Sequence, residues 1–267
     1  MRVRVPASIA NLGPGFDILA MAVDLWLEVE AEPAAVPSWS FSGEGADFLG
    51  QHPNPLSVLP MRGEVRCGIP LGVGLGSSAA ARLAAAVLSA DPDPLGAATK
   101  AEGHPDNVAA AFRGGLVMSV GGALLDLPRP DLEIALLVAF DPVPTERARS
   151  VLPPAIPHAT AVLNAGRLAL LVEVFHSRRW DLLGAASEDS LHQPFRESLY
   201  PWVARVRAAA LEAGALASAV CGAGPSVFAY CRQGEASGVA QSMEHASGGR
   251  GRALVTQVSS SGLVVEA

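Results

Sequence analysis

The sequence predicts an α+β protein with two mixed layers of helices and strands that meet near residue 130. Short apolar and alternating runs, which are typical of strands, fill the first third of the chain, and an alanine-rich run over residues 79–88 predicts a helix. Residues 217–258 have the pattern strand, strand, helix, strand. The segment Pro-Arg-Pro at residues 128–130 is the best linker. We therefore expect one domain over residues 1–130 and a second over residues 131–267.

The first predicted domain begins with strands. Val3 and Val5 alternate with arginines, and residues 25–30 continue in the same extended pattern. Residues 43–60 are rich in glycine and proline and predict a segment that is mostly loop. A further short strand is expected over residues 64–69.

The predicted helix over residues 79–88 begins at the two serines that precede it and ends at an Asp-Pro step. Alanine and leucine, the strongest helix formers, make up most of it. Residues 102–112 then predict a turn and a short helix, and residues 116–120 predict a strand.

The second predicted domain opens with a continuous apolar run over residues 134–140, which is typical of a buried strand. A helix-rich stretch follows from about residue 160 to residue 214. The final elements are expected over residues 217–220 and 227–231 (strands), 235–245 (helix) and 253–258 (strand).

Composition excludes several classes of protein. Half of the 267 residues are hydrophobic and 17% are charged, which excludes a disordered chain. The net charge of −7, with no basic or aromatic patch, argues against a nucleic-acid partner. No apolar run reaches the ~18 residues that span a bilayer, and no secretory signal is recognisable, so we expect no membrane association. The three cysteines form no C-x-x-C pair and predict reduced thiols of a cytoplasmic protein.

Lysine usage limits the phosphate chemistry that the chain can perform. Lys100 is the single lysine, so neither the G-x-x-x-x-G-K-[ST] phosphate loop nor a protein kinase of the V-A-I-K type is present. Any phosphate site must therefore use backbone amides, arginine or a metal ion.

Three glycine-bearing segments carry the strongest functional signals. In residues 72–78, three alternate glycines lead into a helix that begins with paired serines. Such a loop presents unpaired amides and the positive end of the helix dipole to an anion. The alternative is an ordinary strand-to-helix turn capped by Ser77.

The second segment is a Gly-Pro-Gly turn at residues 13–15, which can hold Asn11 and Asp17 side by side. An amide and a carboxylate in that arrangement suit a small polar ligand with an ammonium group, although an Asx-capped turn explains the pattern equally well. The third segment, Cys-Gly-Ala-Gly-Pro-Ser at residues 221–226, lets backbone approach a ligand or a neighbouring loop and is weak evidence alone.

Together these segments resemble the signatures of the GHMP small-molecule kinase superfamily, and within it they are most similar to the homoserine kinases. The matching elements are P-A-S-x-A-N-L-G-P-G-F-D at residues 6–17, I-P-L-G-x-G-L-G-S-S-A-A at 69–80, E-G-H-P-D-N-V at 102–108, T-x-x-A-R-x-x-L-P at 145–153, H-Q-P-F-R at 192–196 and G-A-G-P-S-V-F at 222–228. The resemblance implies a two-domain fold, in which a nucleotide-binding N-terminal domain with the phosphate loop packs against a ferredoxin-like C-terminal domain.

The resemblance implies ATP and Mg²⁺ at a cleft between the two domains. Asn54 is the residue expected to meet the adenine, in a weak match to the family's N-L-V element. The residues expected around the phosphates are Pro70, Leu71, Gly72, Val73, Gly74, Leu75, Gly76, Ser77 and Ser78. Ser78 and Glu102 are the candidate metal ligands, since Lys100 replaces the earlier glutamate of many relatives.

The expected substrate is L-homoserine, a zwitterion whose carboxylate requires arginine and whose ammonium requires a carboxylate. By resemblance Arg149 and Arg196 bind the carboxylate and Asp17 binds the ammonium. Asn11 and His104 are expected at the hydroxyl end.

By the same resemblance Asn107 and Arg149 are the catalytic residues. An asparagine at Asn107 occupies the position at which mevalonate kinase has an aspartate, and an amide cannot take a proton. We therefore expect direct attack by the substrate hydroxyl, whose proton leaves late, with Asn107 holding the geometry.

The resemblance leaves two alternatives open, a GHMP kinase for another small alcohol and a non-catalytic relative that binds nucleotide or amino acid. Mevalonate has no ammonium group, so Asp17 argues against it. Dimers are common among relatives, which makes a homodimer an expectation. A helix usual in relatives is expected to be reduced to a turn or lost, because only residues 55–63 remain for it.

Overall fold

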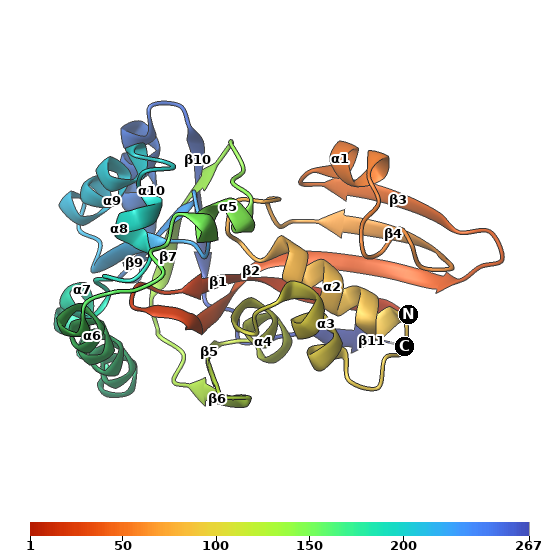
Figure 1. Cartoon of the computed structure of the whole chain (residues 1–267). Coiled ribbons are helices and arrows are strands. Elements are labelled where there is room, and N and C mark those ends of the chain that lie inside the picture. Colours follow the sequence, from red (N-terminus) through yellow and green to blue (C-terminus); the bar gives the residue numbers. More distant parts are fainter. Residues whose placement is uncertain (267) are drawn as a thin grey trace.

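The computed structural model describes residues 1–266, which form two β-sheets with helices packed against them (Figure 1). The first sheet has the strand order β11-β1-β2-β4-β3, and a hairpin of β5 and β6 pairs with β2. Its strands are β1 (Arg2–Asn11), β2 (Gly15–Pro33), β3 (Ser38–Gly43), β4 (Met61–Cys67), β5 (Leu116–Val120), β6 (Ala123–Leu127) and β11 (Val264–Glu266).

The two faces of the first sheet differ in chemistry because side chains alternate along a strand. Val3, Val5 and Val29 point inward and are buried. Arg2 and Glu28 lie on the opposite face and form an ion pair. At its outer end the sheet therefore has one core face and one charged, solvated face, whereas residues 5–11 of β1 are all buried.

Four helices belong to the first sheet: α1 (Ala46–Gln51), α2 (Ser77–Leu88), α3 (Pro94–Glu102) and α4 (Asp106–Arg113). The helices α2 and α4 pack on β1 and β2. In α2 the buried residues include Ala80, Leu83 and Ala84, which share one helical face. The small alanines let the helix lie close to the sheet, and this places its N-terminus at the centre of the molecule (Figure 1).

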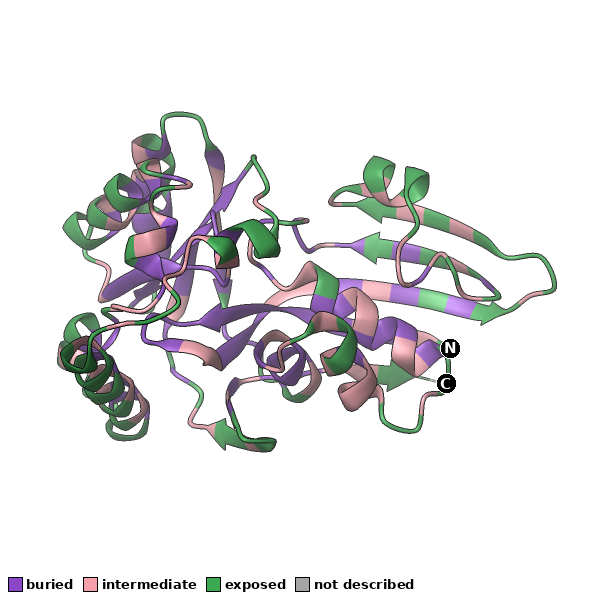
Figure 2. Ribbon diagram, viewed as in Figure 1, coloured by how far each residue is buried: buried purple, intermediate pink, exposed green. Residues whose placement is uncertain are grey.

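The second sheet contains β7 (Glu133–Ala139), β8 (Ala217–Val220), β9 (Val227–Cys231) and β10 (Gly251–Gln257). Its order is β10-β7-β9-β8 and all its pairs are antiparallel. The helices α9 (Trp202–Glu212) and α10 (Ala236–Ser247) pack on it. This is the ferredoxin-like arrangement that the resemblance implies. The strands β7, β8 and β9 are buried, β10 at the edge is partly exposed, and the outer faces of the helices are exposed (Figure 2).

The segment between β7 and α9 contains α5 (Thr145–Ser150), α6 (His158–Ser177), the 3₁₀ turn η1 (Trp180–Leu182), α7 (Leu183–Ala186) and α8 (Gln193–Arg196). By length and composition alone α6 is apolar enough to cross a membrane, although Arg167 and Glu173 interrupt its apolar residues. In the fold α6 packs against α7. Its buried Asn164 also donates a hydrogen bond of 2.9 Å to the Pro14 carbonyl oxygen.

The structure corrects the predicted elements at several places. The segment expected as loop, residues 43–60, contains α1, and β3, β6, β11 and α3 were also not predicted. The last of these strands, β11, pairs with β1, so the chain returns to the first sheet at its end. Residues 55–60 form only a turn, as expected for the shortened helix.

Candidate active site

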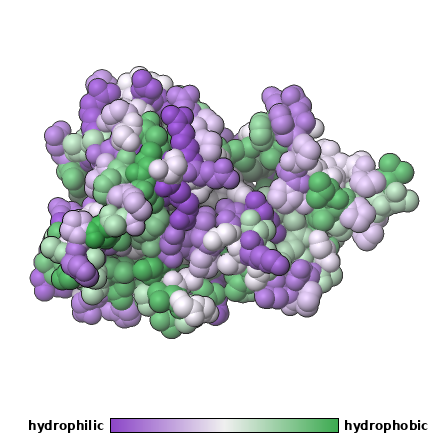
Figure 3. All heavy atoms as spheres, viewed as in Figure 1, coloured by the Kyte–Doolittle hydropathy of each residue, from purple (hydrophilic) through white to green (hydrophobic). Residues whose placement is uncertain are grey.

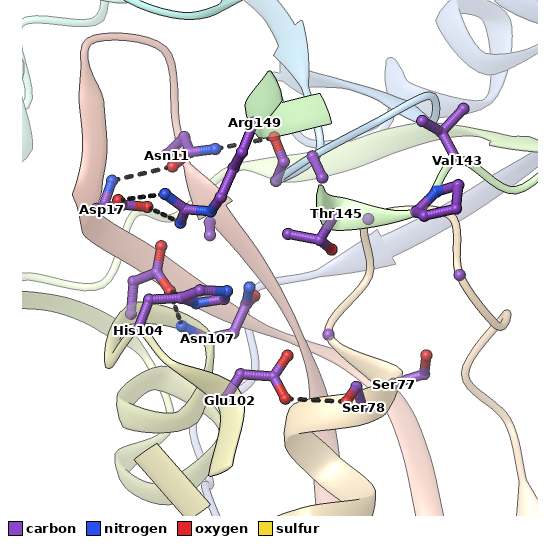
Figure 4. Close-up of a pocket in the computed structure, with 18 of the residues that line it drawn as sticks. Asn11, Asp17, Ser77, Ser78, Glu102, His104, Asn107, Val143, Thr145 and Arg149 are labelled. Atoms are coloured by element: carbon purple, nitrogen blue, oxygen red, sulfur yellow. Dashed lines mark hydrogen bonds and ion pairs between the residues drawn. The ribbon is translucent and has the colours of Figure 1, made fainter. Parts of the chain in front are cut away.

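A cavity of about 310 Å³ lies where the two sheets meet, and residues from both halves of the chain line it. From the first half come Asn11, Asp17, Gly72, Gly74, Gly76, Ser77, Ser78, Glu102, His104 and Asn107, and from the second half come Pro142, Val143, Thr145, Arg149, Arg196 and Gly222. Hydrophilic residues gather along the middle of the face drawn in Figure 3, between the two parts of the molecule. Figure 4 shows the side chains pointing into this cavity.

In the loop over residues 72–78, glycines that line the cavity alternate with apolar residues that are buried in the core. Gly72, Gly74 and Gly76 all have positive φ, between +69° and +88°, a conformation that glycine adopts without strain. All three line the cavity. The side chains between them, Val73 and Leu75, are buried in the core and anchor the loop.

Helix α2 begins at Ser77, within this segment. Its N-cap, Gly76, provides no side-chain hydrogen bond, so backbone amides at the helix N-terminus face the cavity without a capping side chain. Ser77 and Ser78 stand at this end of the cavity (Figure 4). Unpaired amides at a helix N-terminus are an arrangement suited to a phosphate group.

Ser78 and Glu102 are in direct contact. The Ser78 hydroxyl donates a hydrogen bond of 2.9 Å to Glu102 Oε2, while Lys100 is exposed to solvent. Arg82, one helical turn beyond Ser78, places its Nε 2.9 Å from the same carboxylate oxygen. Sequence reasoning missed Arg82, although its i,i+4 spacing from Ser78 was a signal.

The turn over residues 12–14 brings Asn11 and Asp17 together, as the sequence predicts. Asn11 Oδ1 accepts a hydrogen bond of 3.1 Å from the Asp17 amide, and Asn11 Nδ2 donates one of 2.8 Å to the Gly222 carbonyl oxygen. The Asp17 carboxylate receives two hydrogen bonds from Arg149, at 2.9 and 2.6 Å. The Asp17 bond raises the pKa of Arg149 above its usual value.

Arg196 is held rigidly at the base of the cavity. Its side chain is buried and donates to the carbonyl oxygens of Ala148 and Gly222, at 3.1 and 2.9 Å. Burial lowers the pKa of Arg196. The guanidinium groups of Arg149 and Arg196 each lie 5.3 Å from the centre of the Phe16 ring, so this aromatic ring keeps the two cations beside each other.

His192 contacts Arg196 and the turn that contains Gly13. Its Nε2 donates a hydrogen bond of 2.9 Å to the Gly13 carbonyl oxygen, and its Nδ1 accepts one of 3.2 Å from Arg196. This pattern requires a neutral imidazole. Desolvation by burial lowers the pKa of His192 to about 4, which is consistent with the neutral form.

His104 and Asn107 face the cavity between the two regions just described (Figure 4). His104 Nδ1 donates to Asp106 Oδ1 at 3.0 Å, and this hydrogen bond raises the pKa of His104. Asn107 Oδ1 accepts a hydrogen bond of 2.9 Å from the buried hydroxyl of Ser8. The Asn107 amide nitrogen is therefore the group available to a ligand.

Several predicted site residues lie outside the cavity lining. Asn54 uses its amide within its own turn, donating to the Leu49 carbonyl oxygen at 3.0 Å and accepting from the amides of Leu56 and Ser57 at 3.1 Å. The others are Pro70, Leu71, Val73 and Leu75, whose side chains support the loop. Conversely, Thr145 lines the cavity at the start of α5, and its place in the T-x-x-A-R element was the available signal.

Comparisons with known proteins agree with this geometry. Residues 171–248 match the family described as GHMP kinases C terminal. The structure of a homoserine kinase from Cytophaga hutchinsonii superposes with a TM-score of 0.87 at 30% identity, covering 100% of this chain and 97% of that one. A mevalonate kinase from L. major, 13% identical, has the same fold with a TM-score of 0.75 over 98% of this chain and 97% of its own.

The fold and these matches thus define the chain as a GHMP kinase, an ATP-dependent phosphotransferase. Curated homoserine kinases from Thermus thermophilus and a Synechococcus species are 41% and 34% identical to it. The alignments cover 95% of this chain and 94% of the first relative, and 100% and 98% for the second. The chain belongs to the homoserine kinase family.

Proposed function

We propose that this protein transfers the γ-phosphoryl group of ATP to the side-chain hydroxyl of L-homoserine, giving O-phospho-L-homoserine for threonine biosynthesis. The observation that carries the proposal is the distribution of charge in the cavity. A phosphate-binding loop lines one end, and Asp17, Arg149 and Arg196 line the other. These side chains supply a partner for each charged group of an amino acid. The proposal also places the enzyme in the cytoplasm, where ATP is present.

The residues at the phosphate end fit Mg²⁺. The ion prefers oxygen ligands and takes one or two carboxylates together with substrate phosphates and water. Ser78 and Glu102 supply a hydroxyl and a carboxylate at the loop, and residues 1–266 contain no cluster of three or more His, Cys, Asp or Glu that would suit another kind of metal site. Ser78 and Glu102 would hold the ion, which would neutralise phosphate charge.

The chain's own groups align the reactants and stabilise charge. Phosphoryl transfer has a loose transition state that spreads negative charge over the phosphate oxygens. The amides of residues 72–78 and the N-terminal end of α2 face that charge. Arg149 lies on α5 at the acceptor end and orients the substrate there.

Asn107 acts as a positioning group in this proposal, because its amide cannot serve as a base. Ser8 holds the amide oxygen, which leaves the nitrogen to donate to the acceptor hydroxyl or to a phosphate oxygen. The hydroxyl proton then leaves late, to the γ-phosphate itself. We expect Asn107→Ala to lower kcat by less than the ~10⁴ that a general base contributes. A larger loss, with homoserine binding unchanged, would exclude a purely positional role.

The proposed function is tested by coupled ADP release with MgATP and a panel of L-homoserine, D-homoserine, L-serine, L-threonine and mevalonate. We expect turnover with L-homoserine and at least tenfold lower kcat/KM for every other alcohol. Preferred turnover of another alcohol would replace the substrate and keep the fold. Folded protein that binds ATP and turns over none of them would indicate a binding protein instead.

A further inference from the structure

The charged groups at the acceptor end of the cavity neutralise each other. Arg149 Nη1 and Nη2 donate to the two carboxylate oxygens of Asp17, at 2.9 and 2.6 Å, so that the pair is bidentate (Figure 4). In the proposed function these same two groups receive the carboxylate and the ammonium of the substrate. Each is therefore already satisfied by the other before a ligand enters.

Both members of this pair are held in place by their surroundings. Asp17 has φ +57° at the start of β2, and its amide is fixed by Asn11. The Arg149 guanidinium lies 5.3 Å from the centre of the Phe16 ring. Arg196, by contrast, donates only to carbonyl oxygens and to His192. The cavity thus contains one arginine that has a carboxylate partner and one that has none.

We propose that the Asp17–Arg149 pair makes the cavity selective for zwitterions, a role that rests on the proposed homoserine kinase function. A zwitterion that opens the pair gives each side chain a new counter-charge, so one ion pair is replaced by two. A ligand with a carboxylate alone reaches Arg196, but it can recruit Arg149 only by leaving Asp17 unpaired. A ligand with an ammonium alone leaves Arg149 unpaired in the same way.

The Asp17–Arg149 ion pair lowers the affinity of the cavity for ligands of single charge by a modest factor. The side chains of Arg149 and Asp17 are 36% and 35% exposed to solvent, so water screens the attraction between them. Exposed ion pairs contribute up to a factor of about five in an equilibrium constant, and the bidentate geometry puts this one near that limit. The ammonium and carboxylate of the ligand should therefore bind cooperatively, each being worth about fivefold more when the other is present.

Two analogues that each lack one charge test the proposal. The first, 4-hydroxybutyrate, is homoserine without the ammonium, and the second, 3-aminopropan-1-ol, is homoserine without the carboxylate. Affinities for both and for L-homoserine are measured by ligand-observed NMR on the full chain. We expect Asp17→Asn to bind L-homoserine more weakly than the wild type but 4-hydroxybutyrate about fivefold more tightly, because Arg149 is released.

The reciprocal variant gives an independent arm. Arg149→Met releases Asp17 and should bind 3-aminopropan-1-ol more tightly than the wild type does. Asp24→Asn on β2 and Arg147→Met on α5 make matched changes of charge at residues outside the cavity lining and should leave all three affinities within twofold. Circular dichroism establishes that each variant is folded.

The zwitterion proposal is overturned if 4-hydroxybutyrate binds Asp17→Asn no better than the wild type and 3-aminopropan-1-ol binds Arg149→Met no better. Those results would show that the charged groups of the pocket contribute to ligand affinity independently of one another. Turnover of L-homoserine by the wild type is recorded separately. Its absence would refute the proposed function, whereas a gain in analogue affinity in the variants would still establish the charge filter.

Discussion

A methyl group at Gly74 should separate the phosphate loop from the loop over residues 221–224. Gly74 has φ +88°, and a Cβ built there lies 2.0 Å from the Cys221 carbonyl oxygen and 3.1 Å from the Gly224 nitrogen. The left-handed conformation costs an alanine about 1–2 kcal/mol, and forcing a methyl group into packed backbone adds roughly 1–3 kcal/mol. We therefore expect Gly74→Ala to lose about 2–5 kcal/mol of the free energy of unfolding, together with most of the kinase activity.

Gly234 provides a matched control. Its φ is +84°, yet no heavy atom lies within 4 Å of a Cβ built on it. Gly234→Ala should therefore show only the conformational cost of about 1–2 kcal/mol and keep its activity. Urea unfolding followed by circular dichroism measures both variants. Equal losses, within about 0.5 kcal/mol, would show that the contact between the two loops does not constrain Gly74.

Three further predictions concern the acceptor end, the metal ligands and the buried histidine. Arg196→Met should raise KM for L-homoserine about 10- to 100-fold, because it removes a charge-assisted hydrogen bond. KM for ATP should change less than twofold. An equal rise in both KM values would contradict a role of Arg196 at the acceptor end. Glu102→Gln should raise the Mg²⁺ concentration for half-maximal activity about tenfold or more. The control Lys100→Ala, at an exposed residue, should leave that concentration unchanged. If Glu102→Gln causes no shift, Glu102 is not a metal ligand. For His192 the folded pKa is about 4 and the unfolded value is ~6.5, so the unfolded chain binds more protons between these values. The stability contribution of neutral His192 is full above pH 6.5 and is lost as the pH falls towards 4. Between pH 7 and pH 5 the loss is roughly 2 kcal/mol. Urea unfolding at both values should show a smaller loss for His192→Asn, and equal losses would refute the assignment.

Local sequence signals predicted the elements whose own residues favour one type of secondary structure. The alanine-rich α2 and the apolar β7 were recognised because propensity and burial agree along the whole segment. The strands β3 and β11 were missed, since the first is an exposed strand beside β4 and the second is a three-residue partner of β1. Their pairing depends on distant parts of the chain.

Helix α3 was missed for a different reason. The Asp-Pro step at residues 91–92 predicts the end of a helix, but the Asp-Pro step that follows it at residues 93–94 is a helix start. Asp93 is the N-cap and accepts a hydrogen bond of 2.9 Å from the Gly96 amide, and Pro94 occupies the first helical position. The segment that follows the end of α2 at Leu88 therefore also contains the start of α3.

The sequence predicted which residues gather at the site better than it predicted their contacts. The turn that joins Asn11 to Asp17 follows from local glycine and proline chemistry. The ion pair between Asp17 and Arg149 does not, because 132 residues separate its members. Arg82 and Phe16 were missed similarly, since their contacts with Glu102 and with the two arginines depend on packing between elements.

The most direct test of the account is identification of the product. Wild-type protein is incubated with MgATP and L-homoserine, and phosphorus–proton correlated NMR locates the transferred phosphoryl group. We expect one phosphate ester, on the side-chain oxygen of homoserine, formed in equal amount to ADP. Release of ADP with free phosphate and no ester, or an ester only on an alcohol without the zwitterionic group, would contradict it.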